Sequence, residues 1–187
     1  MLRGQLLIEI NSFANPYPFA LHKVDSFVFK YLEKENHIDI IDEYNLHSFN
    51  INVLDKRTTL TEKLVSLIRF SLSNNPIVDL NSKIRHFYDL YYLMNDQECL
   101  DYVHLTEFIK DFQALLNHDR EKFSHPDGWQ HKSLNESPLI SDWSETWHQL
   151  ASKYSSELPP LAYTAIPSSQ SIEEKLKELL SLMNHIE

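Results

Sequence analysis

The chain of 187 residues contains only two glycines, Gly4 and Gly128. A loop that cradles a phosphate with its backbone needs glycine where φ is positive or where the main chain approaches the ligand closely. Neither glycine lies in a G-x-G-x-x-G or a G-x-x-x-x-G-K-[ST] pattern. The sequence therefore excludes both a Rossmann dinucleotide-binding loop and a P-loop.

Composition is typical of a globular protein of the cytoplasm. Hydrophobic residues make up 42% of the chain and aromatic residues 12%, which argues against disorder. Cys99 is the single cysteine, so no internal disulfide can form and a reducing compartment is expected. No apolar run approaches the roughly 18 residues of a membrane span, and no signal-peptide pattern opens the sequence. We therefore predict a cytoplasmic protein with no membrane partner.

The charge balance is strongly acidic, with a formal net charge of −10 and a pI near 5.4. Proteins that hold nucleic acid by counterion release are usually basic over the contacting face. The balance therefore argues against a dedicated nucleic-acid-binding module, although it leaves room for a local basic cleft.

Residues 1–57 predict two strands and a short helix. Residues 5–11 are apolar almost throughout, with Glu9 as the one charge, and residues 48–54 alternate apolar with polar side chains. Residues 24–34 have apolar residues at helical spacing. Because two strands alone do not form a stable sheet in water, this pair must join something upstream or pack as a flap on the rest of the chain.

From residue 58 onward the pattern is helical. Thr59 followed by Glu62, and Ser171 followed by Glu174, are capping-box signatures that predict two helix starts. Between them, apolar periodicity predicts helices over residues 80–95, 104–123 and 139–157. The expected fold class is α+β and mainly α, with a partial α/β domain at 1–57 and a helical bundle domain at 58–187.

Asp89 is the one charge in the apolar helical segment 87–94. A helix that is apolar around most of its circumference is buried on more than one face. A carboxylate there must be paired, hydrogen-bonded or bound to a cation. Arg85, one turn earlier, can reach it. Asp89 therefore belongs either to an Arg85–Asp89 ion pair that stabilises the bundle, which geometry alone favours, or to the wall of a functional cleft.

Lys63 and Glu9 have similarly open interpretations. Lys63 is expected in the first turn of its helix, where it opposes the macrodipole but could hold a phosphate together with free N–H groups. Considered alone, it is more simply a solvated lysine. Glu9 is either an edge-strand charge or a carboxylate that faces a metal.

The remaining candidates carry less chemistry. The spacing of three histidines fits no standard zinc pattern, and we expect loop positions for them: His118, His125 and His131. The tryptophans form either core or an interaction face: Trp129, Trp143 and Trp147.

Three segments, taken together, resemble one protein family. Residues 53–64 resemble its vl…rTl-x-EKL motif, and residues 83–91 resemble its R-h-x-YDLy motif. Residues 6–10 resemble the k-i-E-i strand that precedes both. The family is the AbiEii/AbiGii-type nucleotidyltransferases, the toxin half of certain bacterial toxin–antitoxin and phage-defence pairs. The order and spacing of the segments argue against chance agreement, and the helices after residue 100 fit the family's bundle loosely.

The resemblance implies roles for four residues and makes the strand pair the remnant of a nucleotidyltransferase sheet. Lys63 matches the lysine that contacts nucleotide phosphates, and Asp89 matches the late aspartate of the active site. Arg85 lies in the same motif as Asp89 and would contact the nucleotide. Glu9 matches the third carboxylate, a ligand of Mg²⁺. Such enzymes use Mg²⁺ to clamp a nucleoside triphosphate (NTP) while its nucleotidyl group passes to RNA or to a protein hydroxyl.

The sequence departs from the family at its first motif, a Gly-Ser or Gly-Gly turn followed by D-x-D. No D-x-D occurs in the sequence, and Gly4 stands alone. We therefore expect the C-terminal part of a nucleotidyltransferase-like toxin that is inactive as this chain alone. Its partners would be a missing upstream domain, a cognate antitoxin and an RNA acceptor, with Mg²⁺ and NTP as cofactors if it is active. The alternative is a non-catalytic helical protein-interaction module.

Overall fold

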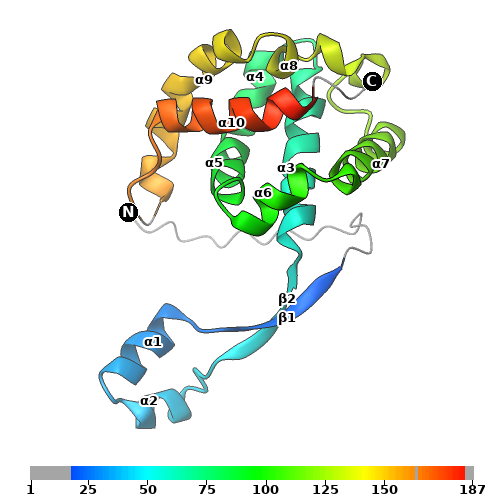
Figure 1. Ribbon diagram of the computed structural model, residues 1–187. Coiled ribbons are helices and arrows are strands. Elements are labelled where there is room, and N and C mark those ends of the chain that lie inside the picture. The colour runs from blue at the N-terminus through cyan, green and yellow to red at the C-terminus, as the bar shows by residue number, and fades with distance from the viewer. Residues whose placement is uncertain (1–17, 163, 184–187) are drawn as a thin grey trace. The chain divides into compact units, whose positions relative to one another are not determined.

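The computed structural model describes residues 18–162 and 164–183 (Figure 1). The chain divides at Asp55–Lys56 into two compact units. The first contains a strand pair and two short helices, and the second is a bundle of helices. The fold is therefore α+β and mainly α, as the sequence predicts.

The first unit is built on an antiparallel pair of strands, β1 (Phe19–Val24) and β2 (Phe49–Leu54). They pair from Phe19 opposite Leu54 to Val24 opposite Phe49. Helices α1 (Phe27–Lys34) and α2 (Ile38–Glu43) connect the two strands. The predicted strand at 48–54 corresponds to β2, whereas the predicted strand at 5–11 lies outside the described residues. Strand β1 was missed because its apolar residues alternate only weakly with polar ones.

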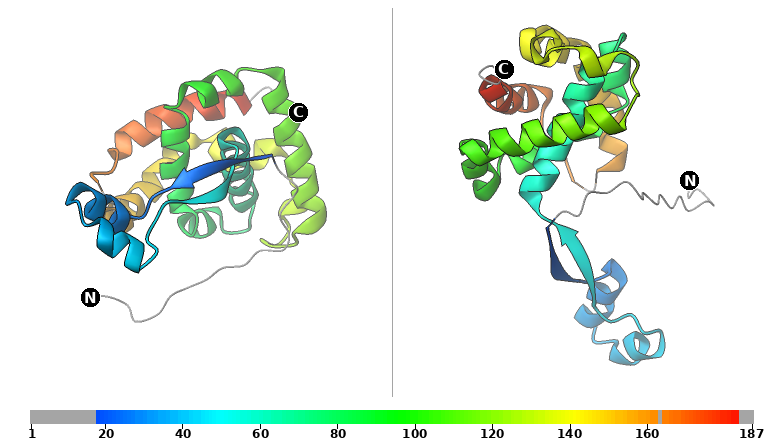
Figure 2. Two further views of the ribbon diagram at one scale, coloured as in Figure 1. Left: turned by 90° about the horizontal axis from the view of Figure 1, so that it is seen from below. Right: turned by 90° about the vertical axis from the view of Figure 1, so that its right-hand side faces the viewer.

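The second unit is organised around α3 (Lys56–Ser71). This helix packs most extensively against α4 (Pro76–Asn81), α5 (Ile84–Leu93), α6 (Gln97–Val103) and α7 (Thr106–Lys122). The bundle is completed by α8 (Pro138–Ser141), α9 (Trp143–Glu157) and α10 (Ser169–Met183), and α10 lies across α5 and α9 (Figures 1 and 2). No helix in the described part of the chain combines the length and hydropathy that crossing a membrane requires.

Several helix boundaries differ from the predictions because local hydrogen bonds override the apolar period. The predicted helix over 80–95 is broken between α4 and α5, where the Ser82 hydroxyl donates to the Asp79 carbonyl at 2.6 Å. The predicted helix over 139–157 is broken at Asp142, whose φ is −152°. Helix α6 was not predicted, although Asp96 caps it by accepting from the Cys99 amide at 3.2 Å.

The two predicted capping boxes were each placed too far along the chain. Helix α3 begins at Lys56, three residues before Thr59. Helix α10 begins at Ser169, and the Ser168 hydroxyl accepts from the Ser171 amide at 3.0 Å. Ser168 thus makes the capping hydrogen bond that the sequence pattern assigned to Ser171.

The tryptophans belong to the core. Trp147 is buried, and its ring lies 5.4 Å from that of Trp143, 5.3 Å from that of Phe87 and 5.4 Å from that of Tyr154. Its indole N–H donates to the Ser169 carbonyl at 3.0 Å, so one side chain links α5, α9 and α10. Trp129 is also buried, and its N–H donates to the Phe123 carbonyl.

We expect Trp147→Ala to lower the free energy of unfolding by about 3–5 kcal/mol, because it leaves a cavity and removes the hydrogen bond from the indole N–H to the Ser169 carbonyl. Urea denaturation followed by circular dichroism measures the change. His148→Ala, an exposed neighbour on the same helix, is the control and should shift stability by less than about 0.5 kcal/mol. A loss below about 1 kcal/mol for Trp147→Ala would contradict its role in the core.

Candidate functional site

Lys63 of α3 and Asp89 of α5 form an ion pair between neighbouring helices. The Lys63 Nζ lies 2.7 Å from the Asp89 Oδ2, and the two side chains are 28% and 34% exposed. The two helices pack on each other through the buried core, which includes Leu60, Leu64, Phe87 and Leu90. This packing fixes Lys63 and Asp89 at the edge of the contact.

The structure corrects two expectations about this pair. Asp89 is bound by Lys63 from another helix, and within the described residues no ion pair joins it to Arg85. Lys63 does not lie in the first turn, since α3 begins at Lys56. An anion at Lys63 would therefore be held by the ammonium group and not by the free N–H groups of the helix start.

The pair lies in a hollow of about 540 Å³, within the range of about 300–1,000 Å³ that is usual for small-ligand sites. Its lining combines the charges of Lys63 and Asp89 with aromatic and aliphatic surface. The remaining lining residues are Thr59, Tyr88, Tyr92, Leu93 and Thr164. Such a lining is suited to a ligand with an anionic end and a flat apolar end.

His86 lies beside the pair and was not singled out in the sequence, although it belongs to the same motif as Asp89. Its Nδ1 is 4.0 Å from the Asp89 Oδ2 and, among the described residues, is buried without a hydrogen-bond partner. Burial lowers the pKa of His86 to about 4, helped by the nearby charges of Lys63 and Lys83 and opposed by Asp89. The imidazole is therefore neutral at neutral pH.

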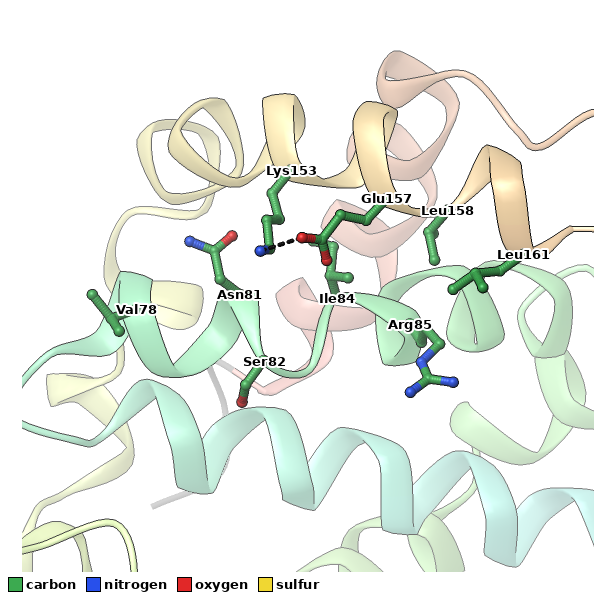
Figure 3. A pocket seen from close by; sticks show the side chains of 9 residues that line it. All are labelled: Val78, Asn81, Ser82, Ile84, Arg85, Lys153, Glu157, Leu158 and Leu161. Atoms are coloured by element: carbon green, nitrogen blue, oxygen red, sulfur yellow. Dashed lines mark ion pairs between the residues drawn. The ribbon is translucent and has the colours of Figure 1, made fainter. Parts of the chain in front are cut away.

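Arg85 lines a different hollow, of about 480 Å³, between α4, the start of α5 and the end of α9 (Figure 3). Its side chain is exposed and makes no ion pair with any described residue. In this hollow Lys153 pairs with Glu157, and the Arg85 guanidinium is turned away from them (Figure 3). Leu158 and Leu161 line this hollow, and Thr164 lines the hollow of Lys63, so the segment after α9 borders both.

A metal site is not formed by the residues that the structure describes. Residues 18–162 and 164–183 contain no group of three or more histidine, cysteine, aspartate or glutamate side chains placed to hold an ion. Among the described residues that line its hollow, Asp89 is the one carboxylate, and Lys63 binds it. Glu9, the predicted ligand, lies outside the described residues. The described donor set therefore does not fit a divalent cation.

His118 was expected in a loop but lies within α7.

Comparison with known proteins gives one match. Residues 1–178 match the family model described as "Nucleotidyl transferase AbiEii toxin, Type IV TA system". No curated protein and no solved structure matches the chain. The match extends over both units and beyond residue 91, where the last of the three resembling segments ends.

We expect Asp89→Asn to change the free energy of unfolding by less than about 1 kcal/mol, because the pair is partly exposed to water. The matched comparison is Asp119→Asn, which removes the partner of Arg69 from a pair only 15% and 14% exposed. That substitution leaves a buried charge unpaired and should cost about 3 kcal/mol. Urea denaturation measures both. If Asp89→Asn costs as much as Asp119→Asn, Asp89 is a structural residue.

We expect acid to destabilise the fold partly through His86. Its pKa of about 4 in the folded chain lies below the ordinary value of 6.5, so between these pH values the unfolded chain binds a proton that the folded chain does not. Its contribution to stability is therefore complete above pH 6.5 and is lost as the pH falls towards 4. His86→Gln should reduce this loss in urea titrations, and an NMR titration should give the low pKa. An imidazole that titrates near 6.5 in the folded protein would disprove the assignment.

Proposed function

The chain belongs to the AbiEii family of nucleotidyl transferase toxins of type IV toxin–antitoxin systems, and from this premise we propose that the Lys63–Asp89 hollow binds an NTP for nucleotidyl transfer. The observation that supports the proposal is a lysine from α3 and an aspartate from α5 that meet at 2.7 Å in one ligand-sized hollow. The partial exposure of both side chains leaves them accessible to a ligand.

Lys63 binds the phosphates in this proposal. Its ammonium carries three N–H donors, so it can donate to a phosphate oxygen while it still contacts Asp89. A phosphate brings more negative charge than one carboxylate, and it therefore competes well for a partly exposed ammonium. Arg85, in the neighbouring hollow, makes a weaker second contact with the nucleotide.

Asp89 acts as the base. The acceptor hydroxyl loses its proton to Asp89, and its oxygen forms a bond to the α-phosphorus. The bond from that phosphorus to the bridging oxygen of the β-phosphate breaks, and pyrophosphate leaves with the electron pair. Because Lys63 occupies the Oδ2 of Asp89, the Oδ1 is the oxygen that accepts the proton. The neutral His86 beside the pair adds no charge that would compete with the phosphates.

We propose that the chain alone is inactive because its sequence contains no D-x-D. Enzymes of this class hold Mg²⁺ with such carboxylates, and the metal neutralises the triphosphate. Glu9 would supply one further ligand. The missing pair would be provided in trans by an upstream domain of the toxin.

The acceptor in this proposal is RNA or a protein hydroxyl, and the setting is a cytoplasmic phage-defence pair with a cognate antitoxin. The family description names a toxin–antitoxin system, which supports the antitoxin as a functional counterpart. The alternative function is a non-catalytic helical module that binds another protein, and the absence of D-x-D from the sequence favours it.

The test is incubation of the full chain with labelled NTP and bulk RNA, with and without a segment that carries the Gly-Ser turn and D-x-D in trans. We expect label transfer only when that segment is added. Lys63→Ala and Asp89→Asn should each reduce the transfer by about 100-fold or more, as expected for loss of a charge contact or a base.

Arg85→Ala, which removes the weaker contact from the same helix as Asp89, should have a smaller effect than Lys63→Ala. Label transfer that survives Lys63→Ala would exclude the proposed site. The absence of transfer under both conditions would favour the protein-interaction module.

A further inference from the structure

The hollow beside Lys63 has an aromatic wall that the transfer reaction does not use. Tyr88 and Tyr92 both line it, and their ring centroids lie 4.9 Å apart at an interplanar angle of 60°. Tyr91 contacts Tyr92 from another side, at 5.4 Å and 87°. Two other rings thus pack against the Tyr92 ring at steep angles.

Tyr92 is exposed in a way that its neighbours are not. It is 46% exposed, whereas Phe87 and Leu90 of the same helix are buried and Tyr88 and Tyr91 are partly buried against the core. The two ring contacts restrict the Tyr92 side chain, while its 46% exposure leaves part of it open to a ligand. A ligand that stacks on it would therefore lose little additional side-chain entropy in ordering the site.

The spacing of α5 places this ring on the same side of the helix as the charged pair. Tyr88 and Tyr92 are four residues apart and Asp89 lies between them, three residues before Tyr92, so these residues neighbour one another on the helix surface. A single ligand in this hollow can touch both the Lys63 ammonium and the aromatic wall.

We propose that the Tyr92 ring, supported by Tyr88, stacks against the base of the nucleotide whose phosphates Lys63 binds. The inference rests on the proposed function, because it takes an NTP as the ligand of the hollow. The flat face of a nucleobase matches an aromatic ring, and such stacking contributes about 5- to 150-fold to binding for each base.

The same lining limits how well the site distinguishes one base from another. Stacking accepts every base, because each has a π-face. Among the described residues that line the hollow, uncharged hydrogen-bonding groups are hydroxyls: those of the two tyrosines, Thr59 and Thr164. There is no asparagine or glutamine amide among them to read a base edge in a two-bond geometry. The four common NTPs should therefore bind within about tenfold of one another.

The test measures equilibrium binding of ATP, GTP, CTP and UTP and of inorganic triphosphate to the full chain. Tyr92→Ala should weaken NTP binding by about 10-fold or more and leave binding of inorganic triphosphate unchanged. Tyr92→Phe keeps the ring and should bind NTP like the unmodified chain. Lys63→Ala should weaken both ligands. Tyr44→Ala, at a tyrosine that is 64% exposed in the first unit, is the matched control and should change neither.

A second variant tests stacking without removing the ring. Tyr92→Trp places an indole at the exposed position, and its fluorescence should be quenched by NTP but not by inorganic triphosphate. If Tyr92→Ala lowers stability, this measurement still tests whether a base stacks on the ring at position 92.

The outcomes separate the two proposals. If Lys63→Ala weakens both ligands but Tyr92→Ala weakens neither, or both equally, stacking is excluded and the phosphate site stands. If Lys63→Ala changes neither ligand, the proposed function fails, whereas an NTP-selective loss in Tyr92→Ala would still support stacking. If the unmodified chain binds neither ligand, both are overturned.

Discussion

The contact between α3 and α5 is the constraint on which the candidate site depends. Leu60 and Leu64 of α3 and Phe87 and Leu90 of α5 are buried in the same core, and the apolar packing of the two helices sets how they face each other. Lys63 and Asp89 lie at the border of that contact, where the charges reach water and each other. The core thus fixes the backbone positions of both polar residues before any ligand binds, which reduces the entropy that binding must overcome.

Two of the ion pairs that helix α3 makes differ in burial, and this difference separates their roles. Near its C-terminal end, Arg69 pairs with Asp119 in dry surroundings and stacks against Phe70, Phe123 and Trp129. A ligand cannot replace either partner there without exposing an unpaired charge, so this pair belongs to the fold. The Lys63–Asp89 pair is about twice as exposed, and water or a phosphate can take the place of either partner at low cost. A binding site requires an ion pair whose partners a ligand can replace.

The sequence predicted the helices, and the family resemblance assigned Lys63 and Asp89 to one candidate site, but helical spacing alone suggested a different partner for Asp89. Periodicity identified the helical half because apolar stripes report burial directly. The motifs also singled out Lys63 and Asp89. The partner of Asp89 was nevertheless misassigned to Arg85, since spacing of one turn within a helix is visible in a sequence and a contact between α3 and α5 is not. Tyr92 was missed for the same reason. The exposure of its ring depends on which other helices pack against it, and a sequence does not show that.

The scarcity of glycine means that the candidate site must recognise a ligand through side chains. A chain without a glycine-rich loop has no backbone cradle of that kind, and Lys63 lies beyond the first turn of α3, where the amide groups are already bonded within the helix. Recognition of a phosphate in the hollow must then come from side chains, of which Lys63 is the cation that lines it. A single ammonium gives charge but little direction. Orientation must come from a second contact at the other end of the ligand, and the only broad surfaces in the described lining are the rings of Tyr88 and Tyr92.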